Sequence, residues 1–200
     1  MGPGAAAVFC GPGDDPQSRG ERPQLEEFPR RGRWQKVLDE LRPGDFVIIQ
    51  FSHNDEKSAD PTRYADPATT FPENLRRFVR EARARQAVPL LATPVCRRKF
   101  DQAGRLVNTH GVYPDVLRGV AKAEKVPLLD LEAATAGWLE REGVENSKKF
   151  FMWIEPGRYA KLPQGREDNT HFVELGATRV AALAVGQMRA LELSLTRWLK

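Results

Sequence analysis

Cysteine is scarce in this sequence, and long apolar runs are absent. The two cysteines, Cys10 and Cys96, lie far apart and form no CxxC pair, which argues against a structural zinc site and against a disulfide. No stretch approaches the roughly 18 apolar residues that span a membrane, so no membrane contact is expected. The N-terminus lacks the basic segment of a signal peptide. A cytoplasmic chain is the default expectation, but a truncated secreted protein would have the same sequence, so the compartment stays unknown.

An excess of charge of one sign is also missing. The sequence has 31 lysines and arginines against 27 aspartates and glutamates, a net charge of +4, and the two signs are interleaved. This pattern is typical of a solvated surface and predicts no nucleic-acid binding. The 200 residues suffice for one domain with a full hydrophobic core.

The first part of the chain differs in composition from the rest. Residues 1–24 are rich in glycine, proline and charge, and they are predicted to form an irregular or disordered tail. Residues 25–200 are predicted to form the folded domain. Three apolar runs predict buried strands, and apolar residues at helical spacing predict helices between them. The strands are expected at 46–51, 88–93 and 126–131, and the helices at 34–41, 70–82, 113–125, 133–142 and 173–193.

This alternation predicts an α/β fold, with a parallel sheet covered by helices on both faces. Polar residues follow the first predicted strand, in the segment Ser52-His53-Asn54-Asp55. Active groups of such sheets gather at the carboxyl ends of the strands. The amide of Asn54 could donate a hydrogen bond to an oxyanion, which is worth about 3–4 kcal/mol when well aimed. Asparagine is also an ordinary turn residue, so this motif alone does not decide between the two roles.

An acid and a histidine stand three residues apart before the last predicted helix, at Asp168 and His171. A catalytic histidine needs a carboxylate on one ring nitrogen, and a turn between loop and helix can supply that geometry. An exposed pair capping the helix has the same spacing, and such matches are frequent by chance. A metal hydrolase using these two residues with His53 and Asp55 is a third alternative, although HExxH spacing is absent.

The two motifs together resemble the SGNH (GDSL-type) hydrolases, and more closely the rhamnogalacturonan acetylesterase group. The block Phe51-Ser-His-Asn-Asp55 is similar to a phenylalanine-glycine-histidine-asparagine-aspartate block of that group, with Ser52 in place of glycine. The similarity runs from about residue 25 to 195. It includes Gly32-Arg-Trp34, Pro43-Gly-Asp45, Tyr64-Ala-Asp66, Asn74-Leu75, Thr93-Pro-Val95 with Arg97-Arg98, and His110-Gly111 with Tyr113-Pro114.

The resemblance implies a three-layer αβα sandwich, no metal or cofactor, and removal of acetyl groups from carbohydrate such as acetylated pectic polysaccharide. It makes His171 the general base, Asp168 its partner and Asn54 an oxyanion donor. Arg97 and Arg98, with His53 nearby, are predicted to bind substrate, because clustered positive charge attracts the carboxylates of pectic chains. A solvated loop is the alternative reading of the two arginines.

Two elements of the group are missing from the sequence. Gly13-Asp14-Asp15 only weakly matches the glycine-aspartate-serine block that carries the nucleophile, and residues 19–31 do not match the block that supplies another oxyanion donor. Residues 2–10 make a doubtful strand, so the first strand is expected to be missing or degraded. The strand at 46–51 would then be an edge open to self-association.

The nucleophile is therefore not identified. Ser18 lies in the predicted tail, and Ser52 occupies a position usually devoted to backbone geometry. A nucleophile must lie within hydrogen-bond reach of its base, which neither setting predicts. By lineage the sequence predicts a carbohydrate esterase with weak or no activity in this chain. The alternative is a non-catalytic sugar-binding relative or a fragment without the serine.

Overall fold

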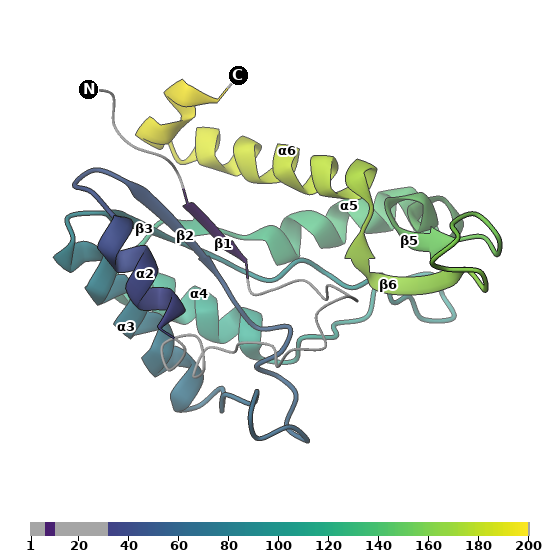
Figure 1. Ribbon diagram of the computed structural model, residues 1–200, viewed down its shortest axis with the longest axis horizontal. Helices are drawn as coiled ribbons and strands as arrows, with labels where there is room; N and C mark the ends of the chain where they lie inside the picture. Colours follow the sequence, from purple (N-terminus) through teal and green to yellow (C-terminus); the bar gives the residue numbers. More distant parts are fainter. Residues whose placement is uncertain (1–6, 11–31, 200) are drawn as a thin grey trace.

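The computed structural model describes residues 7–10 and 32–199. Its elements follow the expected alternation along the chain (Figure 1). They are β1 (Ala7–Cys10), α2 (Arg33–Glu40), β2 (Phe46–Gln50), α3 (Thr70–Ala84), β3 (Val88–Ala92), α4 (Tyr113–Ala123), β4 (Leu128–Leu129), α5 (Leu131–Asn146), η1 (Ser147–Phe150), β5 (Phe151–Ile154), β6 (Arg166–Phe172), α6 (Glu174–Ala190) and η2 (Ser194–Trp198).

The main sheet is parallel and has the strand order β1-β2-β3-β4. The structure corrects the expectation that the first strand is missing, because Ala7–Cys10 pairs with β2 from Ala7↔Val47 to Cys10↔Gln50. β2 is therefore an inner strand and β1 lies beside it at the edge. The rest of the predicted tail lies outside the described residues, so the domain boundary near residue 25 stays a prediction.

Alternate residues of each strand supply two different cores, as the two-residue period of a strand requires. In β2, Val47 and Ile49 pack with α2, α3 and α4, whereas Ile48 packs toward α5, α6 and η2. β3 divides in the same way, with Leu91 on one side and Leu90 on the other. Helices thus cover both faces of the sheet (Figure 1), and the predicted αβα sandwich is confirmed.

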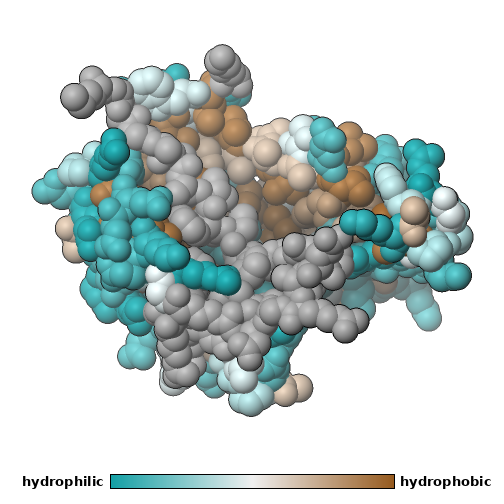
Figure 2. All heavy atoms as spheres, viewed as in Figure 1, coloured by the Kyte–Doolittle hydropathy of each residue, from teal (hydrophilic) through white to brown (hydrophobic). Residues whose placement is uncertain are grey.

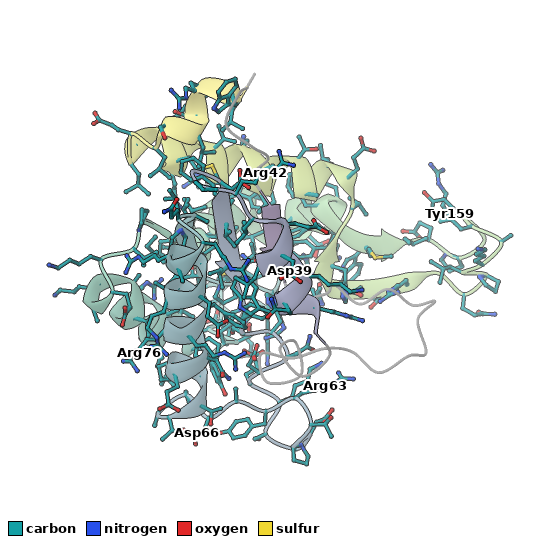
Figure 3. The ribbon with its side chains drawn as sticks, turned by 60° about the vertical axis from the view of Figure 1, so that its left-hand side comes forward. Asp39, Arg42, Arg63, Asp66, Arg76 and Tyr159 are labelled. Atoms are coloured by element: carbon teal, nitrogen blue, oxygen red, sulfur yellow. The ribbon has the colours of Figure 1, made fainter. Side chains whose placement is uncertain are left out.

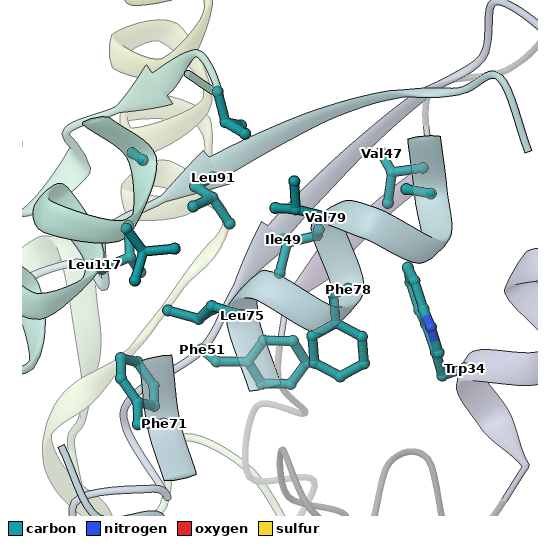
Figure 4. Close-up of a cluster of buried hydrophobic side chains, with 14 of the residues drawn as sticks. Trp34, Val47, Ile49, Phe51, Phe71, Leu75, Phe78, Val79, Leu91 and Leu117 are labelled. Carbon is teal, nitrogen blue, oxygen red and sulfur yellow. The ribbon is translucent and has the colours of Figure 1, made fainter. Parts of the chain in front are cut away.

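Aromatic side chains fill the core on the side of α2 and α3 (Figure 4). Phe51 stacks on Phe78 with ring centroids 5.6 Å apart, and Trp34 meets Phe78 edge-on at 4.7 Å. The indole N–H of Trp34 donates to Glu81. Phe51 is the last apolar residue before the Ser52–Asp55 segment, so this packing anchors the start of that segment.

The last helix covers its face of the sheet less completely. Only Gly176 and Met188 of α6 are buried, although the helix is rich in alanine, valine and leucine. Figure 2 shows apolar side chains along α6, whereas hydrophilic ones predominate over α2 and α3. Among the described residues, no helix has the length and apolar character needed to cross a membrane.

β5 and β6 form a separate antiparallel hairpin. Its base packs on α5 through Phe151, Phe172 and Trp138. Its loop extends away from the body, and Tyr159 lies there with more than half of its surface exposed (Figure 3). Asp168 and His171 lie within β6, whereas we expected them at a turn between loop and helix.

Candidate active site

An irregularity in the β5–β6 hairpin shapes the segment that holds the acid and the histidine. The register passes from Trp153↔Glu167 to Phe151↔Phe172, so Met152 alone faces residues 168–171. Extra residues of this kind form a bulge, and bulges are frequent beside active sites because they redirect side chains. The sequence hides this feature, because nothing in it marks the change of register.

Asp168 holds this bulge together. Its Oδ1 accepts hydrogen bonds from the backbone N–H groups of Thr170 at 2.8 Å and His171 at 2.9 Å. Its Oδ2 lies 2.7 Å from Nδ1 of His171 and 2.6 Å from a guanidinium nitrogen of Arg166. The carboxylate of Asp168 therefore contacts both the ring and the backbone of His171. This contact fixes the orientation of the ring, as a catalytic histidine requires.

The environment keeps Asp168 ionised. Burial opposes its ionisation, but the hydrogen bonds from His171, Thr170 and Arg166 outweigh burial and lower the pKa of Asp168 to about 2. A carboxylate accepts hydrogen bonds only, so Nδ1 of His171 carries the hydrogen. That tautomer leaves Nε2 as the basic nitrogen, which is the arrangement of a general base held by an acid.

The second half of the site is a tight turn after β2. The backbone N–H of Ser52 donates to Oδ2 of Asp55 at 2.9 Å, and the N–H of Glu56 donates to the carbonyl of Ser52 at 3.1 Å. Lys57 donates to Oδ1 of Asn54 at 2.9 Å. Among the described residues, no acceptor bonds Nδ2 of Asn54. The amide N–H group is thus left to donate to a ligand.

Two consecutive arginines tie the halves together. Arg97 donates to the carbonyl of His53 at 3.3 Å, next to Asn54. Arg98 donates from its backbone to the carbonyl of Asn169 at 2.8 Å and from its side chain to Oδ1 of Asn169 at 2.8 Å. The loop after β3 therefore bridges the turn after β2 and the bulge in β6. The topology brings the segments after β2 and β3 together, because the carboxyl ends of parallel strands meet at one edge of the sheet. β6 belongs to the separate hairpin, and the contacts of Arg98 with Asn169 connect it to this edge.

The pKa of His53 depends on groups from both halves of the site. Burial holds the pKa of His53 well below its usual value, so this ring is neutral at pH 7. Its pKa is lowered further by the neighbouring side chains of His110, Arg97, His171 and Lys57. The general-base candidate therefore lies within electrostatic range of the segment that contains Asn54.

The matching family is that of the GDSL-like lipases and acylhydrolases, whose model covers residues 13–157. The chain belongs to this family. It is 41% identical over 168 residues to the rhamnogalacturonan acetylesterase RhgT of Bacillus subtilis, across 84% of this chain and 71% of RhgT. It is 32% identical to the probable rhamnogalacturonan acetylesterase YesY of the same organism, across 84% of this chain and 73% of YesY.

Solved structures show the same GDSL-like fold. The YxiM protein of Bacillus subtilis superposes with a TM-score of 0.71 at 22% identity, covering 86% of this chain and 44% of that one. This chain therefore spans less than half of the YxiM structure. An acetylxylan esterase from Geobacillus stearothermophilus superposes with a TM-score of 0.56 at 15% identity, covering 83% of this chain and 68% of that one. At these identities the likeness concerns the fold alone.

The structure places Arg98 otherwise than we expected for a GDSL-like substrate site. Its side chain is buried, donates to Ser147 at 2.9 Å and to the carbonyl of Val144, and lies over the ring of Trp153 at 5.0 Å. These contacts make Arg98 a residue that positions the bulge rather than a partner for solvent-borne carboxylates. Arg97 and His53 are partly exposed, and their contact with substrate stays a prediction.

Sequence reasoning missed two residues beside the turn, Glu56 and His110. Glu56 forms an ion pair with Arg97 and lies 2.9 Å from Nδ1 of His110. The signal for His110 was present in the His110-Gly111 motif, but no role followed from it. Glu56 directly follows the Phe51–Asp55 block and reads as an ordinary surface acid until the fold brings it against residue 110.

None of the serines among the described residues is shown in contact with His171. Ser52 and Ser147 are buried, with hydroxyl groups bonded to Glu56 at 3.4 Å and to Arg98 at 2.9 Å. Ser58 is exposed in a loop, and Ser194 begins η2 at the other end of the domain. Ser18, like Gly13-Asp14-Asp15, lies outside the described residues. No group of three potential metal-ligating side chains occurs in the described part of the chain.

Proposed function

We propose that this chain is a carbohydrate ester hydrolase that removes acetyl groups from a pectic polysaccharide of the rhamnogalacturonan type. The observation that carries the proposal is the 2.7 Å contact between Asp168 and His171 beside the turn that holds Asn54. The proposal is supported by the similarity to a rhamnogalacturonan acetylesterase, which is 41% identical over 84% of the present chain.

In this mechanism His171 takes the proton of a serine hydroxyl as that oxygen attacks the acetyl carbonyl. Asp168 holds the ring by its Nδ1–H and stabilises the imidazolium that forms. The protonated His171 then gives its proton to the departing sugar oxygen. Water attacks the acetyl-enzyme in the second half of the cycle, with His171 again acting as base, and acetate leaves.

Asn54 stabilises the tetrahedral intermediate of both steps. Its Nδ2–H group donates to the oxyanion, while Lys57 holds its Oδ1 and so fixes which end of the amide faces the substrate. Loss of one such donor costs about 10²–10³ in kcat in hydrolases that use an oxyanion hole. Asn54→Ala should therefore lower kcat by a factor in this range with a smaller change in KM.

Ser18 is the nucleophile candidate to test first, because it follows the Gly13-Asp14-Asp15 segment, and because Ser52 and Ser147 are buried and bonded to other side chains. A fluorophosphonate reagent labels a serine only where a base activates it. Mass spectrometry of the labelled chain should locate the modification at residue 18 and show none in His171→Ala. Ser58→Ala serves as the matched control and should label like the unmodified sequence.

Hydrolysis of acetylated pectin and of p-nitrophenyl acetate tests the proposal as a whole. Release of acetate that disappears in His171→Ala supports it. A folded protein that neither labels nor releases acetate above the His171→Ala background contradicts it.

Substrate charge offers a further test. Arg97 retains about a fifth of its side-chain surface exposed beside the turn, and its charge would attract galacturonate carboxylates. Arg97→Gln should lower kcat/KM for acetylated pectin more than for neutral p-nitrophenyl acetate. Equal effects on both substrates would remove the role in substrate selection.

The second candidate function is non-catalytic binding of sugar. It is favoured by the observation that the hydroxyl groups of Ser52 and Ser147 are bonded to other side chains and that Ser194 lies at the other end of the domain. Calorimetric titration with acetylated rhamnogalacturonan oligosaccharides distinguishes the two candidates. Binding without acetate release favours this second function.

Self-association through the sheet edge also stays a proposal. The edge strand is β1 rather than β2, and it is four residues long. Short edge strands limit pairing between chains, so any dimer would depend on few backbone hydrogen bonds. Size-exclusion chromatography with light scattering over a range of concentrations measures it.

A further inference from the structure

The candidate site contains a second acid–histidine pair that the mechanism above does not use. His110 is 2% exposed, with Nδ1 2.9 Å from Oε2 of Glu56 and Nε2 2.9 Å from the carbonyl oxygen of Val95. Its ring meets the ring of His53 edge to face, with centroids 4.6 Å apart. All 3 histidines of the sequence therefore lie in one region, since His171 is within electrostatic range of His53.

The partners of His110 fix its hydrogens. A carbonyl oxygen only accepts, so Nε2 must donate to Val95. The carboxylate of Glu56 faces the other nitrogen, and it also forms an ion pair with Arg97 and accepts from the hydroxyl of Ser52 at 3.4 Å. An arginine on a carboxylate favours its ionised form. Nδ1 must then donate as well, and a ring that donates from both nitrogens is an imidazolium.

The resulting cluster joins two of the segments that build the site. Glu56 belongs to the turn after β2, whereas Arg97 and His110 both belong to the connection between β3 and α4. Arg97 extends the network by donating to the backbone carbonyls of His53 and Thr109. The buried carboxylate of Asp55 accepts from the backbone N–H of Ser52 in the same segment, so the cluster lies beside the turn that carries Asn54.

We propose that His110 is a protonated positioning residue, which together with Glu56 and Arg97 fixes the Ser52–Asn54 segment. This inference concerns the proposed active site, but it does not depend on ester turnover. The rings of His110 and His53 face each other, and the other charged and titratable groups around them are Glu56, Arg97, Lys57 and His171.

Histidine side-chain NMR tests the protonation directly and needs no ester turnover. In ¹⁵N-labelled protein at pH 7.5, the signals lost in His110→Gln should show two protonated ring nitrogens. The signals of His53 should show one protonated and one bare nitrogen, because its pKa is lowered. A bare nitrogen on His110 at this pH would overturn the proposal.

Glu56→Gln tests the positioning. The amide of glutamine can donate to Nδ1, so His110 should become neutral and the side-chain amide signal of Asn54 should move. Glu124→Gln is the matched control, since it removes a carboxylate that pairs with Arg76 at 3.8 Å on the surface. An Asn54 signal that stays in place in Glu56→Gln, or that moves equally in the control, would overturn the positioning role.

A titration of the unmodified protein serves if Glu56→Gln does not fold. On raising the pH, loss of the extra His110 proton should move the Asn54 amide signal in the same pH range. An Asn54 signal with no inflection where His110 titrates would contradict the proposal. Failure of the esterase proposal alone would leave these spectra as described and abolish only acetate release.

Discussion

Ser52 has a backbone conformation that suits glycine. Its φ is 143°, in the region that L-residues rarely adopt, and its side chain is buried at the start of the turn that carries Asn54. Strain of this kind costs on the order of 1–3 kcal/mol for a residue with a side chain. The related block of the rhamnogalacturonan acetylesterase group has glycine at the equivalent place.

A pair of substitutions separates strain from the loss of the hydroxyl group. Both Ser52→Gly and Ser52→Ala remove the long 3.4 Å contact with Glu56, so that loss cancels between them. Glycine relieves the strain, about 1–3 kcal/mol, but loses about 0.5–1 kcal/mol through the greater freedom of the unfolded chain. The Ser52→Gly protein should therefore be more stable than the Ser52→Ala protein by about 1 kcal/mol.

Urea denaturation followed by circular dichroism measures this difference in the free energy of unfolding. The comparison has a clear sign, because at an unstrained position alanine stabilises a protein relative to glycine by about 0.4–1 kcal/mol. Ser52→Ala as stable as Ser52→Gly, or more stable, would refute the argument from strain.

Three further predictions concern the bulge and its supports. Because the pKa of Asp168 is lowered to about 2 from 3.8, its stabilisation is complete above pH 4 and is lost as the pH falls to 2. Allowing for solvent screening this amounts to about 1–2 kcal/mol, and in Asp168→Asn urea denaturation should show a smaller loss over this pH range. Arg98→Met should lower the free energy of unfolding by about 2–3 kcal/mol, because buried acceptors lose a charged donor. The control Arg105→Met removes an exposed ion pair and should change it by less than about 1 kcal/mol. Equal effects of the two substitutions would contradict the positioning role of Arg98. Gly176→Ala places a Cβ 2.1 Å from the carbonyl oxygen of Phe150 and should cost about 1–3 kcal/mol in thermal unfolding. Gly186→Ala in the same helix meets nothing within 4 Å and should stabilise by up to about 1 kcal/mol; a stabilising Gly176→Ala would refute the packing argument.

Local patterns in the sequence determined the elements of the sandwich. Continuous apolar runs predicted β2 and β3, and helical spacing predicted α3 and α4, whose observed bounds differ from the predicted ones by at most about two residues. These signals are reliable because a buried strand must be apolar on both faces and a helix on one. The spacing of Asp168 and His171 also suggested their contact, but at a turn before the last helix, whereas the structure forms it within the bulge of β6.

Tertiary structure alone decided the rest. The strand Ala7–Cys10 has a weak local signal and forms by pairing with β2, and the bulge that orients His171 depends on the register between β5 and β6. Arg97 and Arg98 are adjacent in sequence, yet one supports the Asn54 turn and the other is buried behind Asn169. The cluster of Glu56 and His110 joins residues 54 positions apart. A sequence states which residues can ionise, but their partners, and therefore their charge, are set by the crossing of chain segments in the fold.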